Sequence, residues 1–114
     1  MEQKIRQGYL YDFYGELLNP HQRAIYESSV LEDLSLAEIA AAEGISRQAV
    51  HDVIRRCNKA LEDYESKLHL VEKFLHIKAN VEEIRILANS EKESSSGETM
   101  KHILHLSQDI LEEL

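Results

Sequence analysis

The sequence predicts an all-α protein, and three observations support that prediction. Four Gly and one Pro in 114 residues are far too few for the turns of an all-β fold. Runs of β-branched residues are absent. Apolar residues recur at spacings of three and four along almost the whole chain, which is the period of a helix. With 43% hydrophobic residues, the chain can bury a modest core.

The first two predicted helices lie before residue 32. One covers about residues 3–17 and has an apolar face made of Leu10, Phe13, Tyr14 and Leu17. Asn19 and Pro20 then mark a break and a restart, because Asn caps helices and Pro suits the first helical position. The second helix is expected from Pro20 to about Leu31, with Gln22 as the partner in a capping box.

Capping signals also delimit the third helix and the start of the fourth. Ser35 and Glu38 have the S-x-x-E spacing of a capping box. Gly44 ends the third helix, as Gly does where the backbone becomes left-handed. Ser46 then caps a fourth helix that starts near Arg47.

The end of the fourth helix is open from the sequence. Neither Pro nor Gly occurs between Gly44 and Gly97. The helix therefore either continues to about residue 75, or breaks without a signal and resumes to about residue 88.

A polar, Ser-rich stretch separates the last helix from the rest. Residues 89–97 are predicted to form a loop or hinge, and residues 98–113 a final helix. We therefore expect a bundle at residues 1–72 and a helical extension at residues 73–114.

Residues 35–56 have the pattern of a helix-turn-helix. Two helices that cross tightly need a small residue at the contact, which is Ala40, and the turn needs Gly44. The packed faces need apolar residues, which are Ile39, Ile45, Val50 and Val53. In such motifs the second helix enters the major groove of DNA by its N-terminal end.

The outer face of this second helix carries the candidate DNA-binding residues. Arg47 and Gln48 lie in its first turn and suit guanine and adenine, while Ser46 and the helix amides suit a phosphate. Asp52 counts against binding because it repels phosphate. The alternative is that these are ordinary solvated positions of a small packing module. The full set is Ser46, Arg47, Gln48, His51, Asp52, Arg55, Arg56 and Lys59.

The net charge limits how such binding would work. The chain has 13 basic and 21 acidic residues, for a net charge of −8. Between Gly44 and Ala60, however, four basic residues face one acidic residue. The charge therefore excludes an indiscriminate, charge-driven binder of nucleic acid, but it leaves room for a local binding face.

Four stretches together resemble the YlxM family: DFYGELL (12–18), LEDLSLAEIA (31–40), GISRQAVHDVIRR (44–56) and KALEDYESKLHL (59–70). The resemblance implies a small bacterial DNA-binding regulatory protein whose helix-turn-helix is like region 4 of sigma factors. It also implies a link to the signal recognition particle, inferred in the family from gene neighbourhood.

Two segments depart from the family pattern, and one part of the chain lies outside it. The family usually has Tyr where His51 stands, and YESSV (26–30) replaces a Tyr-rich helix end. Residues 73–114 match nothing that can be carried over. Any sequence preference of this chain can therefore differ from that of its relatives.

An apolar stripe runs along the fourth helix and beyond it. It either packs within the chain or forms the interface of a homodimer, which we favour, or of another partner. The candidate interface residues are Leu61, Tyr64, Leu68, Val71, Phe74, Leu75 and Ile77. A second functional hypothesis follows from this stripe, namely a protein-interaction accessory module of the signal recognition particle that binds no specific DNA.

The remaining features predict no chemistry. Six His and the single Cys57 lack the spacing of a zinc site, so we expect neither metal nor cofactor. No nucleophile, carboxylate pair or Gly-rich phosphate loop is recognisable, so we expect no enzyme. A signal peptide and a membrane-spanning run are also absent from the pattern, so we expect a cytoplasmic protein that does not contact membranes.

Overall fold

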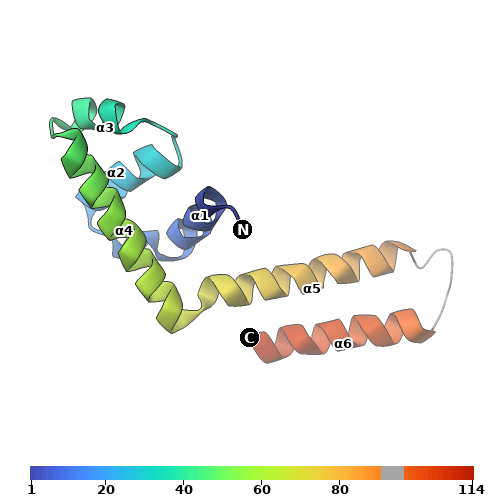
Figure 1. Cartoon of the computed structure of the whole chain (residues 1–114). Coiled ribbons are helices and arrows are strands. Elements are labelled where there is room, and N and C mark those ends of the chain that lie inside the picture. The colour runs from blue at the N-terminus through green and yellow to red at the C-terminus, as the bar shows by residue number, and fades with distance from the viewer. Residues whose placement is uncertain (91–96) are drawn as a thin grey trace. The chain divides into compact units, whose positions relative to one another are not determined.

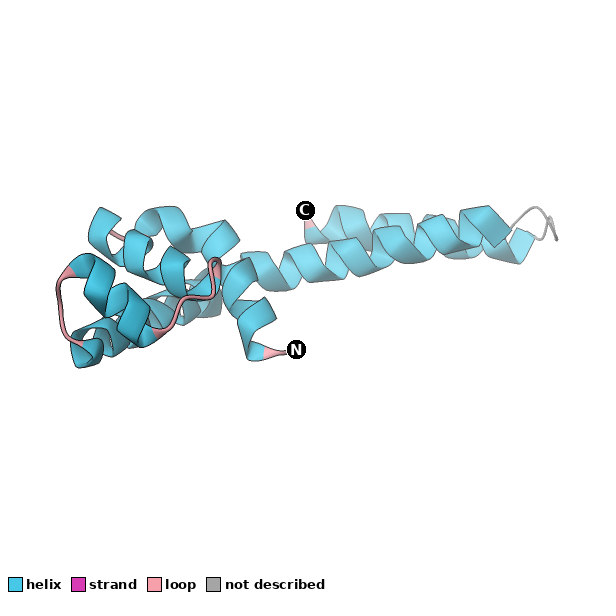
Figure 2. Ribbon diagram, turned by 90° about the horizontal axis from the view of Figure 1, so that it is seen from above, coloured by secondary structure: helices cyan, strands magenta, loops and turns pink. Residues whose placement is uncertain are grey.

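A computed structural model of the chain describes residues 1–90 and 97–114 (Figure 1). All regular elements of these residues are helices, as Figure 2 shows, and the all-α prediction is confirmed. In chain order they are α1 (Gln3–Tyr14), the 3₁₀ turn η1 (Gly15–Leu17), α2 (Pro20–Val30), α3 (Leu36–Glu43), α4 (Arg47–Leu68), α5 (Leu70–Ser90) and α6 (Gly97–Glu113). The chain divides into two units, Met1–His69 and Leu70–Leu114.

The first helix is shorter than its apolar period predicts. It changes from α to 3₁₀ geometry at Gly15, where the backbone lies against the ring of Tyr11. A Cβ atom at position 15 would stand 2.8 Å from two ring atoms of Tyr11, so only glycine fits. This close approach depends on a ring one turn away and is not visible in the apolar spacing.

Both predicted capping boxes are present. Asn19 Oδ1 accepts from the amide of Gln22 (2.8 Å), and Gln22 Oε1 accepts from the amide of Asn19 (3.2 Å). Ser35 and Glu38 exchange the same pair of bonds, both at 3.1 Å. These bonds lower the pKa of the Glu38 carboxyl, because the Ser35 groups donate to its charged form. Side chains therefore satisfy amides in the first turns of α2 and α3.

The core of the first unit forms where α2, α3 and α4 meet. Ile25, Ile39, Ala40 and Val50 are buried together. Half-buried hydrophobic residues pack around them, namely Leu34, Leu36, Ile45, Val53 and Ile54. The predicted inward-facing residues of the motif are thus the ones that hold α3 against α4.

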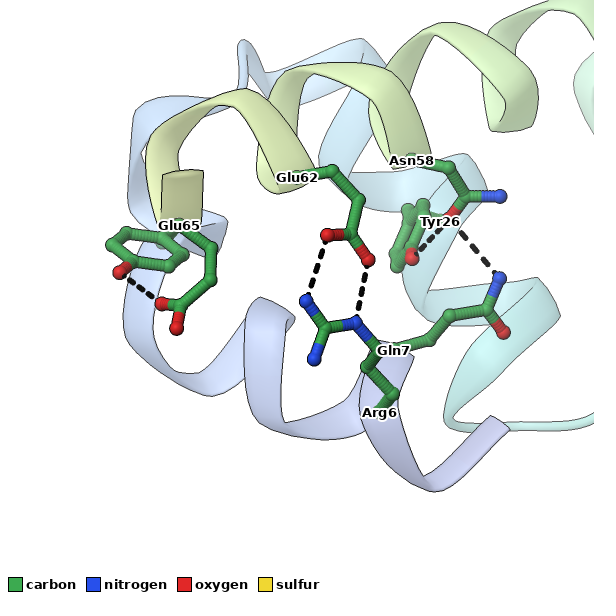
Figure 3. A network of polar contacts seen from close by, with 7 residues as sticks. Arg6, Gln7, Tyr26, Asn58, Glu62 and Glu65 are labelled. Carbon is green, nitrogen blue, oxygen red and sulfur yellow. Dashed lines mark hydrogen bonds and ion pairs between the residues drawn. The ribbon is translucent and has the colours of Figure 1, made fainter. Parts of the chain in front are cut away.

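Polar contacts attach α1 and α2 to the C-terminal half of α4 (Figure 3). Arg6 binds the two carboxylate oxygens of Glu62 at 2.7 and 2.8 Å. Asn58 Oδ1 accepts from Gln7 Nε2 (3.1 Å) and from the hydroxyl of Tyr26 (2.5 Å). One side of the C-terminal half of α4 is therefore occupied by α1 and α2.

A second contact in this region is buried. The hydroxyl of Tyr14 donates to a carboxylate oxygen of Glu65 at 2.6 Å, and both side chains are almost fully covered. Glu65 is the one charged residue among the buried residues of the described chain. A buried carboxylate needs such donors, because leaving it without them costs several kcal/mol, on the order of the loss of a charged hydrogen bond.

The long fourth helix ends at Leu68, and the sequence had left its end open. His69 adopts a left-handed conformation (φ 55°), and its amide donates to the carbonyl of Glu65 (2.9 Å). The chain resumes as a helix at Leu70. Of the two alternatives, the unsignalled break is therefore the correct one.

The second unit is an antiparallel hairpin of α5 and α6, which lie side by side in Figures 1 and 2. His76 pairs with Glu113 (3.2 Å), and His102 pairs with Glu83 (3.3 Å). Of the predicted polar hinge at 89–97, residues 91–96 lie outside the described residues. Its remaining positions belong to the ends of α5 and α6.

Candidate nucleic-acid interface

The helix-turn-helix is built from α3, a tight turn and α4. Gly44 has φ +68°, the left-handed geometry that the sequence predicted for this turn. The amide of Ile45 donates to the carbonyl of Ala40 (3.2 Å), which closes the end of α3. Ser46 then caps α4, because its Oγ accepts from the amide of Ala49 (3.0 Å).

The eight candidate DNA-binding residues cover about half of the circumference of α4 together with its cap, with Arg47 and Arg56 at the two edges. Asp52 is half-buried, and the other seven residues are exposed: Ser46, Arg47, Gln48, His51, Arg55, Arg56 and Lys59. The inward-facing Val50 is completely buried and Val53 is half-buried, which fixes this rotation of the helix. The structure therefore brings all the predicted residues to the surface.

Two of the arginines have no ion-pair partner within the described residues. Arg47 lies in the first turn of α4, and Arg56 lies more than two turns further along. By contrast, Lys59 pairs with Asp63 at 3.2 Å. Arg47 and Arg56 are thus the cations of this face that can bind an external anion without first breaking an internal pair.

Asp52 organises the middle of the face. Its Oδ1 accepts from Gln48 Nε2 (3.1 Å) and lies 3.4 Å from Arg55 Nη2. His51 Nδ1 is 3.9 Å from the same oxygen. The sequence pattern indicates Asp52 only as an unfavourable charge. Its i−4 and i+3 spacing to Gln48 and Arg55 was the signal that it holds these side chains.

A shallow hollow opens beside the first turn of α4. It is lined by Leu36 of α3 and by Arg47, Gln48 and His51 of α4. Leu36 was not among the candidate DNA-binding residues, yet here it supplies an apolar wall next to the candidate base-reading side chains. An apolar contact of this kind suits the methyl group of thymine.

The predicted dimer or partner interface is not one continuous exposed stripe. Leu61 and Val71 are buried and cannot serve as exposed interface residues, which corrects that part of the prediction. Tyr64 is half-buried and its ring lies 5.9 Å from that of Tyr14. Leu75 and Ile77 are half-buried, while Leu68 and Phe74 remain exposed. The break at His69 explains the difference, because it ends the single helix that the stripe assumed.

In the described part of the chain, no group of three or more His, Cys, Asp or Glu is close enough to hold a metal ion. Cys57 is a free, buried thiol whose pKa is raised to about 11 by that burial. None of the described helices is long and apolar enough to cross a membrane.

Comparison with known proteins agrees with this geometry. A family model described as "Putative helix-turn-helix protein, YlxM / p13 like" matches residues 1–103. The chain belongs to this family, UPF0122. The family resemblance of the sequence is thereby confirmed, and the match extends well beyond the helix-turn-helix.

Curated relatives from several bacteria are similar over most of their length. The UPF0122 protein of Clostridium kluyveri is 49% identical over 83 residues, which is 73% of this chain and 71% of the relative. That of Oceanobacillus iheyensis is 51% identical over 74 residues, covering 65% and 70% respectively. That of Shouchella clausii is 46% identical over 85 residues, covering 75% and 78%.

Proposed function

We propose that this UPF0122 protein is a DNA-binding regulatory protein that reads a short sequence with the N-terminal end of α4. The observation that supports this most directly is the exposure of Arg47 and Gln48 in the first turn of a helix held by a helix-turn-helix core. The proposal is one of binding and not of catalysis.

Each side chain of the face has a role that follows from its chemistry. Arg47 can donate two hydrogen bonds to guanine, and Gln48 can form a bidentate pair with adenine. The Ser46 hydroxyl already accepts the amide of Ala49 but can still donate its proton to a phosphate. Arg56 lies further along α4 and suits a backbone phosphate, which positions the helix without reading sequence.

The electrostatic contribution to this binding is small. With a net charge of −8 and few free cations on the face, only a few phosphates can be neutralised. We therefore expect a salt slope of a few units in a plot of log K against log salt. Two copies of the chain would supply two recognition helices, so that two half-sites add their affinities.

Selection of bound DNA from a random pool tests this function. The full chain is expected to enrich one short sequence, and Arg47→Ala to weaken binding to it by about 1–3 kcal/mol with relaxed preference at one base position. Arg56→Ala is the matched control, because it removes another exposed cation of α4 that has no ion-pair partner within the described residues. It should weaken all sequences about equally and lower the salt slope by about 1.

Two outcomes would overturn the proposal. One is equal, weak binding of the wild type to every sequence at moderate salt. The other is an enriched sequence whose affinity and base preference are the same for Arg47→Ala as for the wild type, because α4 would then not be the reading element.

A second candidate function is an accessory role in the signal recognition particle. The acidic balance of the chain suits a basic targeting component, and Leu68, 49% exposed, offers an apolar contact. Capture of the particle's GTPase that survives Arg47→Ala but is lost in Leu68→Glu would favour this role. Absence of that GTPase from the captured proteins would count against it. Both candidate functions place the protein in the cytoplasm.

A further inference from the structure

The hairpin of α5 and α6 carries an exposed apolar surface that the helix-turn-helix does not use. We call it the apolar hairpin face and define it by Phe74 and Val81 of α5 together with Met100, Leu104 and Leu111 of α6. These side chains are 38%, 50%, 48%, 61% and 64% exposed. Exposed apolar residues that occur singly are ordinary, but a cluster of this size normally marks a binding surface.

Helical geometry places the five residues on one side of the hairpin. On α6 the inner residues Ile103, Leu106 and Ile110 are buried or half-buried. Each is followed by one residue of an outer stripe, namely Leu104, Ser107 and Leu111.

The same step on α5 leads from half-buried inner residues to an outer stripe that also holds two cations. The inner residues are Ile77, Asn80, Ile84 and Leu87, and they are followed by Lys78, Val81, Arg85 and Ala88. Phe74 lies seven residues before Val81. The two helices run antiparallel, as Figures 1 and 2 show. A step of one residue therefore rotates both outer stripes to the same side of the pair, about 100° from the contact line.

Two cations of α5 interrupt the apolar hairpin face. Lys78 lies between Phe74 and Val81 in the stripe, with its ammonium 6.0 Å from the centre of the Phe74 ring. Arg85 follows Val81 by one turn and pairs with Glu82. Lys101, His105 and Glu112 of α6 are exposed. They lie in the stripe next to the one that holds Leu104 and Leu111. In a contact between two copies, the alkyl parts of Lys78 and Arg85 can cover apolar surface while their charged ends stay in solvent.

The interior of the hairpin is too small to explain its stability by itself. Among the described residues of Leu70–Leu114, the buried hydrophobic residues are Val71 and Leu106. A pair of helices buries only one side of each helix, so most small helical domains add further helices around a shared core.

The size of the face fits a second copy of the same hairpin. At about 200 Å² for a fully exposed side chain of this size, the five exposed fractions correspond to about 500 Å² per copy, and a standard interface buries about 800 Å² per partner, of which about 60% is apolar. A symmetric contact of the face with itself would thus supply the apolar share of a stable dimer.

We propose that the apolar hairpin face binds the same face of a second copy of this chain, so that two hairpins form a four-helix bundle. The inference rests on the Leu70–Leu114 unit alone and does not depend on DNA binding. It also moves the dimer interface from the stripe along α4 to the outer sides of α5 and α6.

Sedimentation of the full chain without DNA tests the inference. The wild type is expected to be dimeric at about 100 µM and to dissociate on dilution toward about 1 µM. The double variant Leu104→Glu/Leu111→Glu places two carboxylates in the centre of the face and should weaken dimerisation at least about 100-fold. Its helix content, measured by circular dichroism, should remain close to that of the wild type because Glu is a good helix former.

Ile86→Glu is the matched control. Ile86 is 59% exposed and lies five residues after Val81, which places it about 140° around α5 from the face. This variant should dimerise like the wild type. Val81→Gln, on the other helix of the hairpin, should weaken the dimer about 10-fold without adding charge.

Three results would overturn the inference. The first is a wild type that stays monomeric at about 100 µM, which needs no variant to interpret. The second is a folded double variant that remains dimeric. The third is an equal loss of dimer in Ile86→Glu, which would point to a charge effect and not to the face.

Discussion

Gln48 donates its Nε2 proton to Asp52 Oδ1 across one turn of α4, at 3.1 Å. Arg55 approaches the same oxygen from the other side, at 3.4 Å. One carboxylate therefore holds two side chains of the candidate DNA-binding face and lowers the net positive charge of that face. In a complex with DNA, Gln48 and Arg55 would exchange this carboxylate for a base or a phosphate.

We predict that Asp52→Asn increases affinity for nonspecific DNA. Asn keeps an acceptor oxygen for Gln48 but removes a negative charge that repels phosphate, which should tighten nonspecific binding by about threefold to tenfold at low salt. Fluorescence anisotropy with a labelled random duplex measures this. Asp12→Asn is the control, because it removes the same charge from an exposed position of α1, outside the candidate DNA-binding face. An equal gain in both variants would assign the effect to net charge and not to the face.

The turn of the helix-turn-helix should require glycine. Gly44 has φ +68°, so Gly44→Ala should lower the free energy of unfolding by about 1–2 kcal/mol. Gly8→Ala makes the same chemical change inside α1, where nothing lies within 4 Å of the added methyl group. It should raise the free energy of unfolding by about 0.5–1 kcal/mol. Urea denaturation of the two variants beside the wild type checks both signs, and a shift of the same sign in both would contradict the prediction.

Coupling between Arg6 and Glu62 should depend on pH. The hydrogen bond from Arg6 holds the pKa of the Glu62 carboxyl below its ordinary value of 4.5. The stability from this pair is therefore fully present above the unfolded pKa and is lost as the pH falls through the lower, folded pKa.

A double-mutant cycle with Arg6→Gln and Glu62→Gln measures that coupling. Because the two side chains are 38% and 46% exposed, we expect at most about 1 kcal/mol at neutral pH. The coupling should approach zero in acid well below pH 4.5, the ordinary value for the carboxyl. A coupling that is unchanged across this range would show that the carboxylate charge is not its source.

Cys57 should report on the opening of the first unit. The side chain is completely buried, and burial raises the pKa of its thiol to about 11. Near pH 8 the native protein should react with a thiol reagent at least about 100-fold more slowly than free cysteine. Little of the thiol is ionised at this pH, and the reagent cannot reach the buried sulfur. The same reaction in denaturing urea is the control and should be fast. Rapid modification of the native chain would mean that α4 separates from its neighbours far more often than its packing implies.

The parts of the fold that sequence analysis predicted depend on near neighbours in the chain. Ser35 and Glu38 form a capping box within four residues. Gly44 adopts the left-handed conformation that ends α3. Exposure of Arg47 and Gln48 likewise follows from the buried Val50 on the same helix. Local hydrogen-bond rules and helical periodicity were sufficient for each of these.

Other features depend on contacts that the sequence does not reveal. Gly15 is required by the ring of Tyr11, and the 3₁₀ turn there shortened a helix that periodicity had extended to residue 17. Leu61 shares its apolar spacing with exposed residues, and only packing shows that it is buried.

The sequence by itself determined that this chain is all-α, that residues 35–56 form a helix-turn-helix, and which side of α4 carries its polar residues. Tertiary structure alone decided where α4 ends. Histidine is more frequent in the left-handed conformation than most residues, but it adopts it only rarely, so His69 does not mark the break in the way that a glycine would. That break ends the stripe along α4 at Leu68, because the regular period of a helix does not continue through a left-handed residue.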